Sequence, residues 1–200
     1  MTLGAGVGTG VAARPVAVGI LDAAEQCFER RGVRRTTIED VAAEAGVSRV
    51  TVYRQVGNRD ELVRAVLLRV TDRFIERALP KVVAAAGDLT EGVRELMVAT
   101  VMAARRDNSL SLLFAAEEAG ATGRPIPGAT EPLIERFGAA VGHLDRHLPG
   151  RLRPDVTTDD AGEWVTRVVV SLLTVERAQP RDEPSLRRWV ARFAVNALVA

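Results

Sequence analysis

Apolar residues recur at helical spacing in almost every segment of the chain from Arg14 onward. Leu21, Ala24 and Phe28, for example, stand three or four positions apart, which places them on one face of a helix. The alternating pattern of a half-buried strand and the Asn-Gly turns of hairpins do not occur in the sequence. Glycine and proline residues interrupt the helical pattern often enough to divide the chain into about nine helices. The sequence therefore predicts an all-α fold.

The composition is that of a globular protein without a membrane-spanning segment. Of the 200 residues, 47% are hydrophobic, which is enough to bury a core, and no run of about 18 uncharged apolar residues occurs. Residues 1–13 are rich in glycine and contain no basic residue, so we expect a disordered tail rather than a secretory signal. Cys27 is the only cysteine, which rules out an intrachain disulfide and a cysteine-based metal site. We expect a cytoplasmic protein with no membrane partner.

Residues 41–48 have the features of a tight turn between two helices. Ala42 is small enough for a second helix to cross closely, and Gly46 can adopt the left-handed backbone conformation of a turn. Val47 can fill the corner, and Ser48 can accept a hydrogen bond from the first turn of the next helix. Together these residues predict a helix-turn-helix.

The first helix of this motif has a recognisable start. Thr36 with Glu39, or Thr37 with Asp40, has the spacing of a capping box, in which a hydroxyl and a carboxylate satisfy two free backbone N–H groups. Either pair predicts that the helix begins just before Ile38.

The second helix, over residues 49–55, has an outer face that suits DNA. Val52 is expected to point inward, whereas five residues face outward: Arg49, Val50, Thr51, Tyr53 and Arg54. Arginine can read guanine in a major groove, valine and threonine methyl groups can touch a thymine methyl, and hydroxyl groups can hold phosphates. The net charge of the chain is only +1, but residues 45–59 contain three arginines and no acidic residue.

Residues 20–66 resemble the N-terminal DNA-binding domain of the TetR family of bacterial transcriptional regulators. The residues that carry the resemblance keep a fixed spacing without a gap; they are Ala23, Ala24, Phe28, Gly32, Thr36, Thr37, Ile38, Val41, Ala42, Ala45, Gly46, Val47, Ser48, Thr51, Val52, Tyr53, Arg59, Asp60, Glu61 and Leu62. The resemblance implies a homodimeric repressor that a small apolar or amphipathic molecule releases from a palindromic operator. It implies a DNA-binding domain at residues 14–60 and a ligand-binding and dimerisation domain at residues 61–200.

The resemblance also assigns roles to single residues. Thr37, Thr51 and Tyr53 correspond to phosphate contacts of the family, Arg49 and Val50 fall where the family reads bases, and Arg59 stands in place of a lysine that holds a phosphate. Gln55 and Val56 depart from the Tyr or His and the Phe that are frequent there. The predicted DNA-contacting residues are Thr37, Ser48, Arg49, Val50, Thr51, Tyr53, Arg54 and Arg59.

The chain beyond residue 60 predicts helices that can enclose an apolar pocket. Methionine and aromatic side chains adapt to varied apolar ligands, and a carboxylate can meet a cationic or hydroxylated one. The candidate pocket residues are Met97, Val101, Met102, Phe114, Glu117, Phe137 and Trp164. Packing in a plain hydrophobic core is the alternative interpretation of the apolar members, and solvent exposure is the alternative for Glu117.

The last two predicted helices carry apolar stripes that are too wide for one neighbour within a monomer. A four-helix interface between two copies would bury them, and this is where the resemblance places the family dimer. The candidate interface residues are Val168, Leu172, Trp189, Phe193 and Ala197.

Two alternative functions remain open at this point. A structural DNA-binding protein that senses no ligand would need no cavity. A helical metalloenzyme would use Glu117, Glu118, His143 and His147, of which the two histidines stand four residues apart on one helix face. No further ligand shares that face, and no nucleophile elbow or glycine-rich phosphate loop occurs, so we expect no enzyme activity, no metal and no cofactor.

Overall fold

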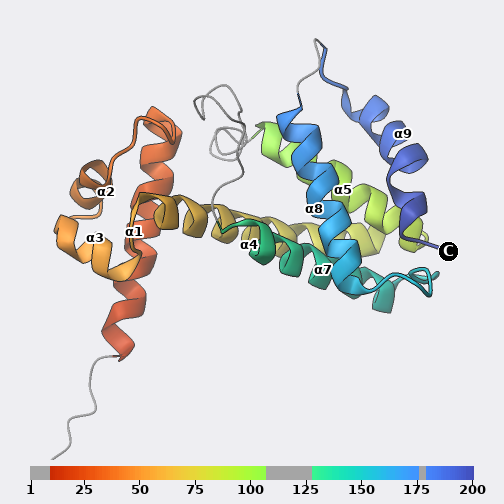
Figure 1. The fold of residues 1–200 in the computed structure, drawn as a ribbon, viewed down its shortest axis with the longest axis horizontal. Coiled ribbons are helices and arrows are strands. Elements are labelled where there is room, and N and C mark those ends of the chain that lie inside the picture. Colours follow the sequence, from red (N-terminus) through yellow and green to blue (C-terminus); the bar gives the residue numbers. More distant parts are fainter. Residues whose placement is uncertain (1–9, 107–127, 176–178) are drawn as a thin grey trace, which may run out of the picture. The chain divides into compact units, whose positions relative to one another are not determined.

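The computed structural model describes residues 10–106, 128–175 and 179–200. Within these residues the fold is all-α, which confirms the prediction from helical spacing (Figure 1). The helices are α1 (Gly10–Arg31), α2 (Ile38–Glu44), α3 (Arg49–Gln55), α4 (Arg59–Ala85), α5 (Leu89–Arg106), α7 (Thr130–His147), α8 (Thr158–Thr174), α9 (Glu183–Phe193) and the short 3₁₀ helix η1 (Val195–Ala197). No helix in the described residues combines the length and hydrophobicity needed to cross a membrane.

The chain divides into two compact units, residues 1–66 and residues 67–200, which we call the N-terminal unit and the C-terminal unit. The division falls within α4, between Val66 and Leu67, so one continuous helix belongs to both units. The sequence predicts a boundary near residue 60, at the start of that helix. The helix α4 therefore connects the two units.

The first helix begins earlier than the sequence indicates. Residues 10–13, which we expected in a disordered tail, form the first turn of α1, whereas residues 1–9 lie outside the described part of the chain. Two of these four residues, Ala12 and Ala13, have the highest helix propensity of any residue type. Glycine at the first position of a helix is also less unfavourable than glycine in the interior.

The core of the N-terminal unit lies between α1, α2 and α3, which all contact one another. Ile20 and Phe28 of α1 are at most 1% exposed, and Val41 of α2 and Val52 of α3 are fully buried. Burying side chains of this size stabilises the unit by about 1.5–3 kcal/mol each. The helical spacing of these residues in the sequence therefore corresponds to one shared core.

The loop between α1 and α2 is held by two threonines with different tasks. The buried hydroxyl of Thr36 donates to the carbonyl of Gly32 at 2.8 Å, which ties the loop to the end of α1. Thr37 forms the capping box with Asp40, so the second of the two predicted cap pairs is the one that forms. The backbone N–H and hydroxyl of Thr37 hold the pKa of Asp40 below its ordinary value. Both threonines thus fix where α2 begins.

Glycines bring α7 and α8 into close contact in the C-terminal unit. A methyl group added at Gly162 of α8 would lie 2.3 Å from the carbonyl oxygen of Ile134 and 2.8 Å from the α-carbon of Gly138, both in α7. A methyl group added at Gly138 would lie 2.7 Å from the carbonyl oxygen of Thr158. The two backbones therefore touch where each helix has glycine, and no larger residue fits between them.

An ion pair joins α5 to α9. The guanidinium of Arg187 donates two hydrogen bonds to the carboxylate of Glu95, at 2.9 and 2.8 Å. These bonds hold the pKa of Glu95 below its ordinary value and raise the pKa of Arg187. Bidentate geometry of this kind is stronger and more specific than a single-point ion pair. It fixes the rotation of α9 against α5.

The end of the chain does not continue as a helix, although the apolar spacing through Leu198 predicts one. α9 ends at Phe193, η1 follows, and Val199 pairs with Leu152 in an antiparallel bridge. The backbone N–H of Arg153 donates to the carbonyl of Leu198 at 2.9 Å. Hydrogen bonds to a loop far away in the sequence therefore replace those that a longer α9 would make.

The glycine contact leads to a direct test. We expect Gly162→Ala to destabilise the protein by about 1–3 kcal/mol, because its methyl group meets backbone atoms that no side-chain rotation can move. Gly19→Ala is the matched control: Gly19 is also helical, but nothing lies within 4 Å of an added methyl group. The control should stabilise α1 by about 0.5–1 kcal/mol. Urea unfolding followed by circular dichroism would measure both, and equal midpoints for the two variants would contradict the packing described.

Candidate DNA-binding interface and effector site

The start of α3 is built by the turn that precedes it. Gly46 adopts a positive φ of 65°, the left-handed conformation that the sequence predicts there. The hydroxyl of Ser48 accepts a hydrogen bond from the backbone N–H of Thr51 at 3.1 Å and lies 2.9 Å from the Thr51 hydroxyl. Ser48 is therefore the N-cap of α3. Because Val52 is fully buried, the rotation of α3 about its own axis is fixed.

The outward face of α3 exposes the residues that were predicted to contact DNA. Val50 is 73% exposed and Tyr53 is 44% exposed, and Arg49 and Arg54 are exposed as well. Thr51 is half-buried beside the cap. An exposed valine and tyrosine between two arginines form a surface that is apolar at its centre and cationic around it, which is the chemistry of a helix that enters a major groove.

Arg49 is held by a carboxylate of the other helix of the motif. Its guanidinium lies 2.7 Å from a carboxylate oxygen of Glu39 in α2, and it also stacks over the Tyr53 ring, 5.6 Å from the ring centre. Both members of the ion pair are more than half exposed, so the pair is weak and reversible. DNA would have to compete with Glu39 for this arginine.

Arg59 is exposed, and its guanidinium also binds the protein backbone. Its guanidinium donates to the carbonyl of Val33 at 2.6 Å and to the carbonyl of Thr36 at 3.3 Å. Two of its three nitrogens thus hold the loop between α1 and α2. A guanidinium has five N–H groups, so the predicted phosphate contact would use those that the two carbonyls leave, while the two observed bonds position the loop that carries Thr37.

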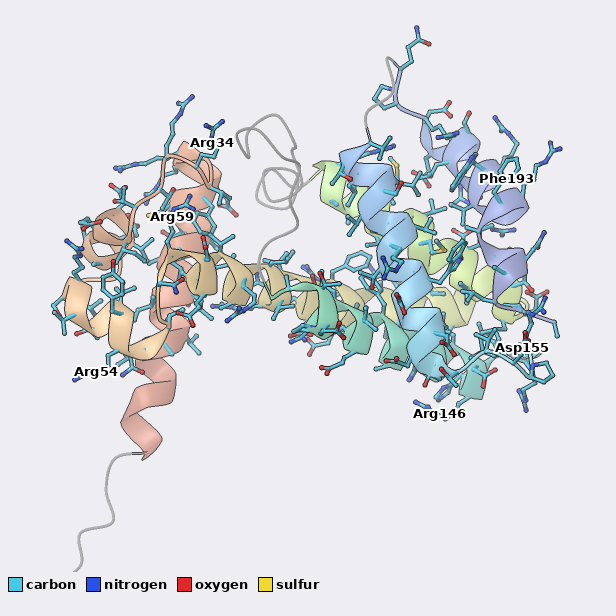
Figure 2. The ribbon with its side chains drawn as sticks, in the orientation of Figure 1. Arg34, Arg54, Arg59, Arg146, Asp155 and Phe193 are labelled. Carbon is cyan, nitrogen blue, oxygen red and sulfur yellow. The ribbon has the colours of Figure 1, made fainter. Side chains whose placement is uncertain are left out.

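Two further cations belong to the same loop. Arg34 and Arg35 are exposed and directly precede Thr36, and we did not select them from the sequence. Figure 2 shows Arg34 and Arg54 toward opposite ends of the N-terminal unit. Neighbouring arginines are less available, since Arg30 pairs with Glu44 and Arg31 pairs with Asp40. The signal in the sequence was an Arg-Arg pair next to a helix cap, where phosphate oxygens can also meet backbone N–H groups.

The C-terminal unit contains a cavity of about 30 Å³ between α4, α5, α7 and α8. Among the described residues, its walls are apolar except for three threonines; these residues are Thr71, Phe74, Thr100, Ala103, Ala104, Leu133, Phe137, Thr166, Val169, Val170 and Leu173. Of the predicted pocket residues that the structure describes, Phe137 is the one in this lining. The threonines and Phe74 were missed because their inward positions depend on how four helices rotate against one another.

The other predicted pocket residues in the described part of the chain lie outside this lining. Met97 and Val101 are fully buried in the core, and Met102 lines a separate groove of about 470 Å³ between α4, α5 and α9. Trp164 is 36% exposed, and its indole N–H donates to the carbonyl of Ala194 at 2.9 Å, so it fastens α8 to the end of α9. Phe114 and Glu117 lie outside the described residues.

The residues predicted for a dimer interface lie on α8, α9 and η1, with different exposure. Phe193 is 57% exposed and projects from α9 (Figure 2), whereas Val168, Leu172 and Trp189 are half-buried. The rings of Trp189 and Phe193 lie 5.7 Å apart, which joins two of these side chains into one apolar surface. Ala197 is exposed, but it belongs to η1 rather than to the predicted continuation of α9.

The two histidines of the metalloenzyme alternative stack on each other at the end of α7. The ring centres of His143 and His147 are 4.1 Å apart, and Nδ1 of His147 lies 2.8 Å from the carbonyl oxygen of His143. Within the described ranges, no group of three or more histidine, cysteine or carboxylate side chains could hold a metal ion. Glu117 and Glu118 lie outside those ranges.

Comparison with known proteins finds a family match for residues within the N-terminal unit. Residues 20–66 match the family model described as bacterial regulatory proteins, tetR family. An uncharacterized HTH-type transcriptional regulator of Mycobacterium tuberculosis is 29% identical over 178 residues, which are 88% of this chain and 82% of that protein. The HTH-type transcriptional regulator TtgR of Pseudomonas putida is 46% identical over 61 residues, or 30% of this chain and 29% of that protein.

Solved structures show that the likeness in fold extends beyond the N-terminal unit. The TetR family repressor AlkX from Dietzia sp. covers 91% of this chain, and this chain covers 96% of that structure, with a TM-score of 0.66 and 20% identity. The fatty acid degradation regulator FadR of Bacillus halodurans has a TM-score of 0.59 at 18% identity, with 94% and 97% of the two chains covered. The helix-turn-helix, the family match over residues 20–66 and the shared fold agree, and the chain is similar to the TetR family of bacterial transcriptional regulators.

Proposed function

We propose that this protein is a homodimeric repressor that binds a palindromic DNA operator through α3 and is released by a small apolar or amphipathic molecule. The observation that carries the proposal is the outward face of α3. A valine that is 73% exposed between cations has no packing role within the chain. In a major groove its methyl groups can contact a thymine methyl while Arg49 reads guanine.

Phosphate contacts would lie on either side of the base contacts made by Arg49 and Val50. The hydroxyl groups of Thr37 and Tyr53 and the cations Arg34 and Arg54 lie at exposed positions on the helix-turn-helix and on the loop before it. Such contacts orient a protein on the duplex and make its affinity depend on salt, whereas base contacts supply the sequence preference. The N-terminal unit thus offers both kinds of contact.

A second copy of the chain would cover the apolar surface of α8 and α9. Phe193 and Trp189 belong to this surface, and aromatic residues of this kind dominate the binding energy of interfaces. A two-fold dimer also explains a palindromic operator, because it sets two α3 helices about one DNA turn apart.

The cavity favours an effector-responsive regulator over a structural DNA-binding protein that senses no ligand, because the latter would need no cavity. α4 lines the cavity through Thr71 and Phe74 and is continuous with the helix-turn-helix unit. The neighbouring Asp72 receives two hydrogen bonds from Arg136 of α7, at 2.6 and 3.0 Å, so α4 is fastened to the cavity wall. We infer that a ligand acts by shifting α4. Among proteins of the same fold, Bacillus subtilis FadR was solved in complex with stearoyl-CoA, which is consistent with an amphipathic effector.

The DNA-binding proposal is tested by selection of duplexes from a random pool with the purified full-length protein. We expect enrichment of a palindrome, and an affinity for it that falls with salt by a slope of about −0.9 per phosphate contact. Arg49→Ala should relax the preference at one base pair by about 1–3 kcal/mol. Arg146→Ala, which removes an exposed arginine of α7, is the control and should change nothing. Binding without sequence preference would contradict the proposal.

The ion pair between Glu39 and Arg49 predicts a gain of affinity. We expect Glu39→Gln to strengthen operator binding about twofold to fivefold, because DNA would no longer compete with a carboxylate for the guanidinium. Fluorescence anisotropy with a labelled operator would measure the change. Glu163→Gln removes a comparable exposed partner of an arginine within α8 and serves as the control. In the Arg49→Ala background the gain should shrink; an undiminished gain there would show that Glu39 acts only through its overall charge.

The proposed dimer predicts a change of mass in solution. We expect Phe193→Asp to convert the dimer to a monomer, because a carboxylate would be buried without a partner at the centre of the interface. Light scattering coupled to size-exclusion chromatography would measure the mass. Val18→Asp places the same charge on a valine of α1 that is 52% exposed, and it should leave the mass unchanged. A Phe193→Asp variant that keeps the dimer mass would exclude this surface as the interface.

A further inference from the structure

The groove between α4, α5 and α9 is large enough for a small molecule. Its volume of about 470 Å³ lies within the range of roughly 300–1,000 Å³ that is usual for ligand sites. The cavity described above, at about 30 Å³, has room only for about two waters. The wall that α4 contributes to the groove runs from Phe74 to Val82, which is roughly 12 Å of helix. An extended hydrocarbon chain can therefore lie along the groove.

The floor of the groove is apolar. Ala78 and Val82 of α4 and Val98 of α5 are at most 9% exposed, and Met102 of α5 is half-buried. Each pair stands four positions apart, so each helix turns one apolar face toward the groove. Hydrocarbon that lies against this floor leaves water, which favours binding. Methionine also adapts its shape to different apolar ligands.

The α4 side of the groove carries two cations that have no carboxylate partner in the described part of the chain. Arg77 and Lys81 line the groove, are exposed and lie about one turn apart. The Nε atom of Arg77 donates to the carbonyl of Arg73 at 2.9 Å, so its two Nη groups remain for a ligand. N–H groups of a guanidinium can bind both oxygens of a carboxylate, and the ammonium of Lys81 adds another donor. A carboxylate on this side would meet two cations.

The α9 side of the groove carries charges that are already paired. Arg187 donates two hydrogen bonds to Glu95 and lies 3.3 Å from a carboxylate oxygen of Glu183. Glu183 also lies 3.4 Å from Arg106. The two carboxylates in the described lining thus both have cationic partners. The described lining has an excess of positive charge, and this excess lies on α4.

We propose that the groove binds a small amphipathic carboxylate, whose anionic group is held by Arg77 and Lys81 and whose hydrocarbon chain lies against Val98 and Met102. The inference rests on the proposed function, because it names the chemical class of the effector and its contacts with α4. The groove is bounded by three helices, which suits a single molecule rather than a lipid bilayer. An uncharged molecule of the same shape gains only the apolar contact, and a cationic one is repelled.

Three probes with the same eight-carbon chain test the proposal: octanoate, 1-octanol and octylammonium. Calorimetric titration of the full-length protein without DNA measures their affinities. We expect octanoate to bind about tenfold more tightly than 1-octanol, because only the carboxylate gains charge-assisted hydrogen bonds, and octylammonium not to bind. Added salt should weaken octanoate and leave 1-octanol unchanged, because salt screens exposed charges.

Substitutions in the groove separate the charge from the apolar floor. The double variant with Arg77→Gln and Lys81→Gln should bind octanoate only as tightly as 1-octanol, and both replaced side chains are exposed, so we expect it to fold. Arg146→Gln removes an exposed arginine outside the described lining and should keep the preference for octanoate. Ala99→Leu enlarges a lining side chain of α5 and should weaken octanoate and 1-octanol alike. Thermal unfolding followed by circular dichroism confirms that each variant is folded.

The two methionines of α5 report where the probe binds. Met102 lines the groove, whereas Met97 is fully buried in the core. With ¹³C-labelled methionine methyl groups, we expect octanoate to shift the NMR signal of Met102 more than that of Met97. A larger shift at Met97 would place the probe elsewhere and overturn the proposal. It is also overturned if 1-octanol or octylammonium binds as tightly as octanoate, if the double variant keeps the preference for octanoate, or if no probe binds.

These outcomes are distinguishable from those of the proposed function. A protein that selects a palindrome but does not bind octanoate loses this inference and remains a DNA-binding regulator. A protein that binds octanoate in the groove but selects no DNA keeps the ligand site and loses the proposed function.

Discussion

The close contact of α7 and α8 at Gly138 and Gly162 determines the arrangement of the C-terminal unit. At each glycine there is room only for the backbone of the other helix. This contact fixes the distance between the two helices and the rotation of each helix about its own axis. Phe137 directly precedes Gly138, and Thr166 lies about one helical turn after Gly162. The glycine contact therefore turns both residues toward the same cavity. The lining of the cavity follows in part from two residues that have no side chain.

The N-terminal unit depends on a different constraint, namely hydrogen bonds between side chains and backbone atoms. Thr36 and Arg59 bind carbonyl groups at the end of α1 and in the loop that follows, and Ser48 caps α3. These bonds position an exposed helix of only seven residues, which could not hold its shape alone in water. Rigid placement of α3 matters for recognition because base contacts require a defined orientation in the groove.

Local signals made the helix-turn-helix predictable from sequence. Gly46 needs a left-handed conformation, Ser48 lies where a cap is required, and the inward position of Val52 follows from helical spacing. Each of these features involves residues only a few positions apart. The role of Arg59 was not predictable in the same way, because the carbonyl groups that it binds belong to residues more than twenty positions earlier.

The sequence by itself determined the all-α fold, the helix-turn-helix and the outward face of α3, because periodicity and capping act over one or two turns of chain. Only the tertiary structure decided which side chains line the cavity. Met97 and Trp164 are residue types that often line pockets. Met97, however, is buried in the core, and the indole N–H of Trp164 donates to the carbonyl of Ala194. Thr166 likewise lines the cavity only because four helices pack around that space, and neither capping nor helical spacing predicts that packing.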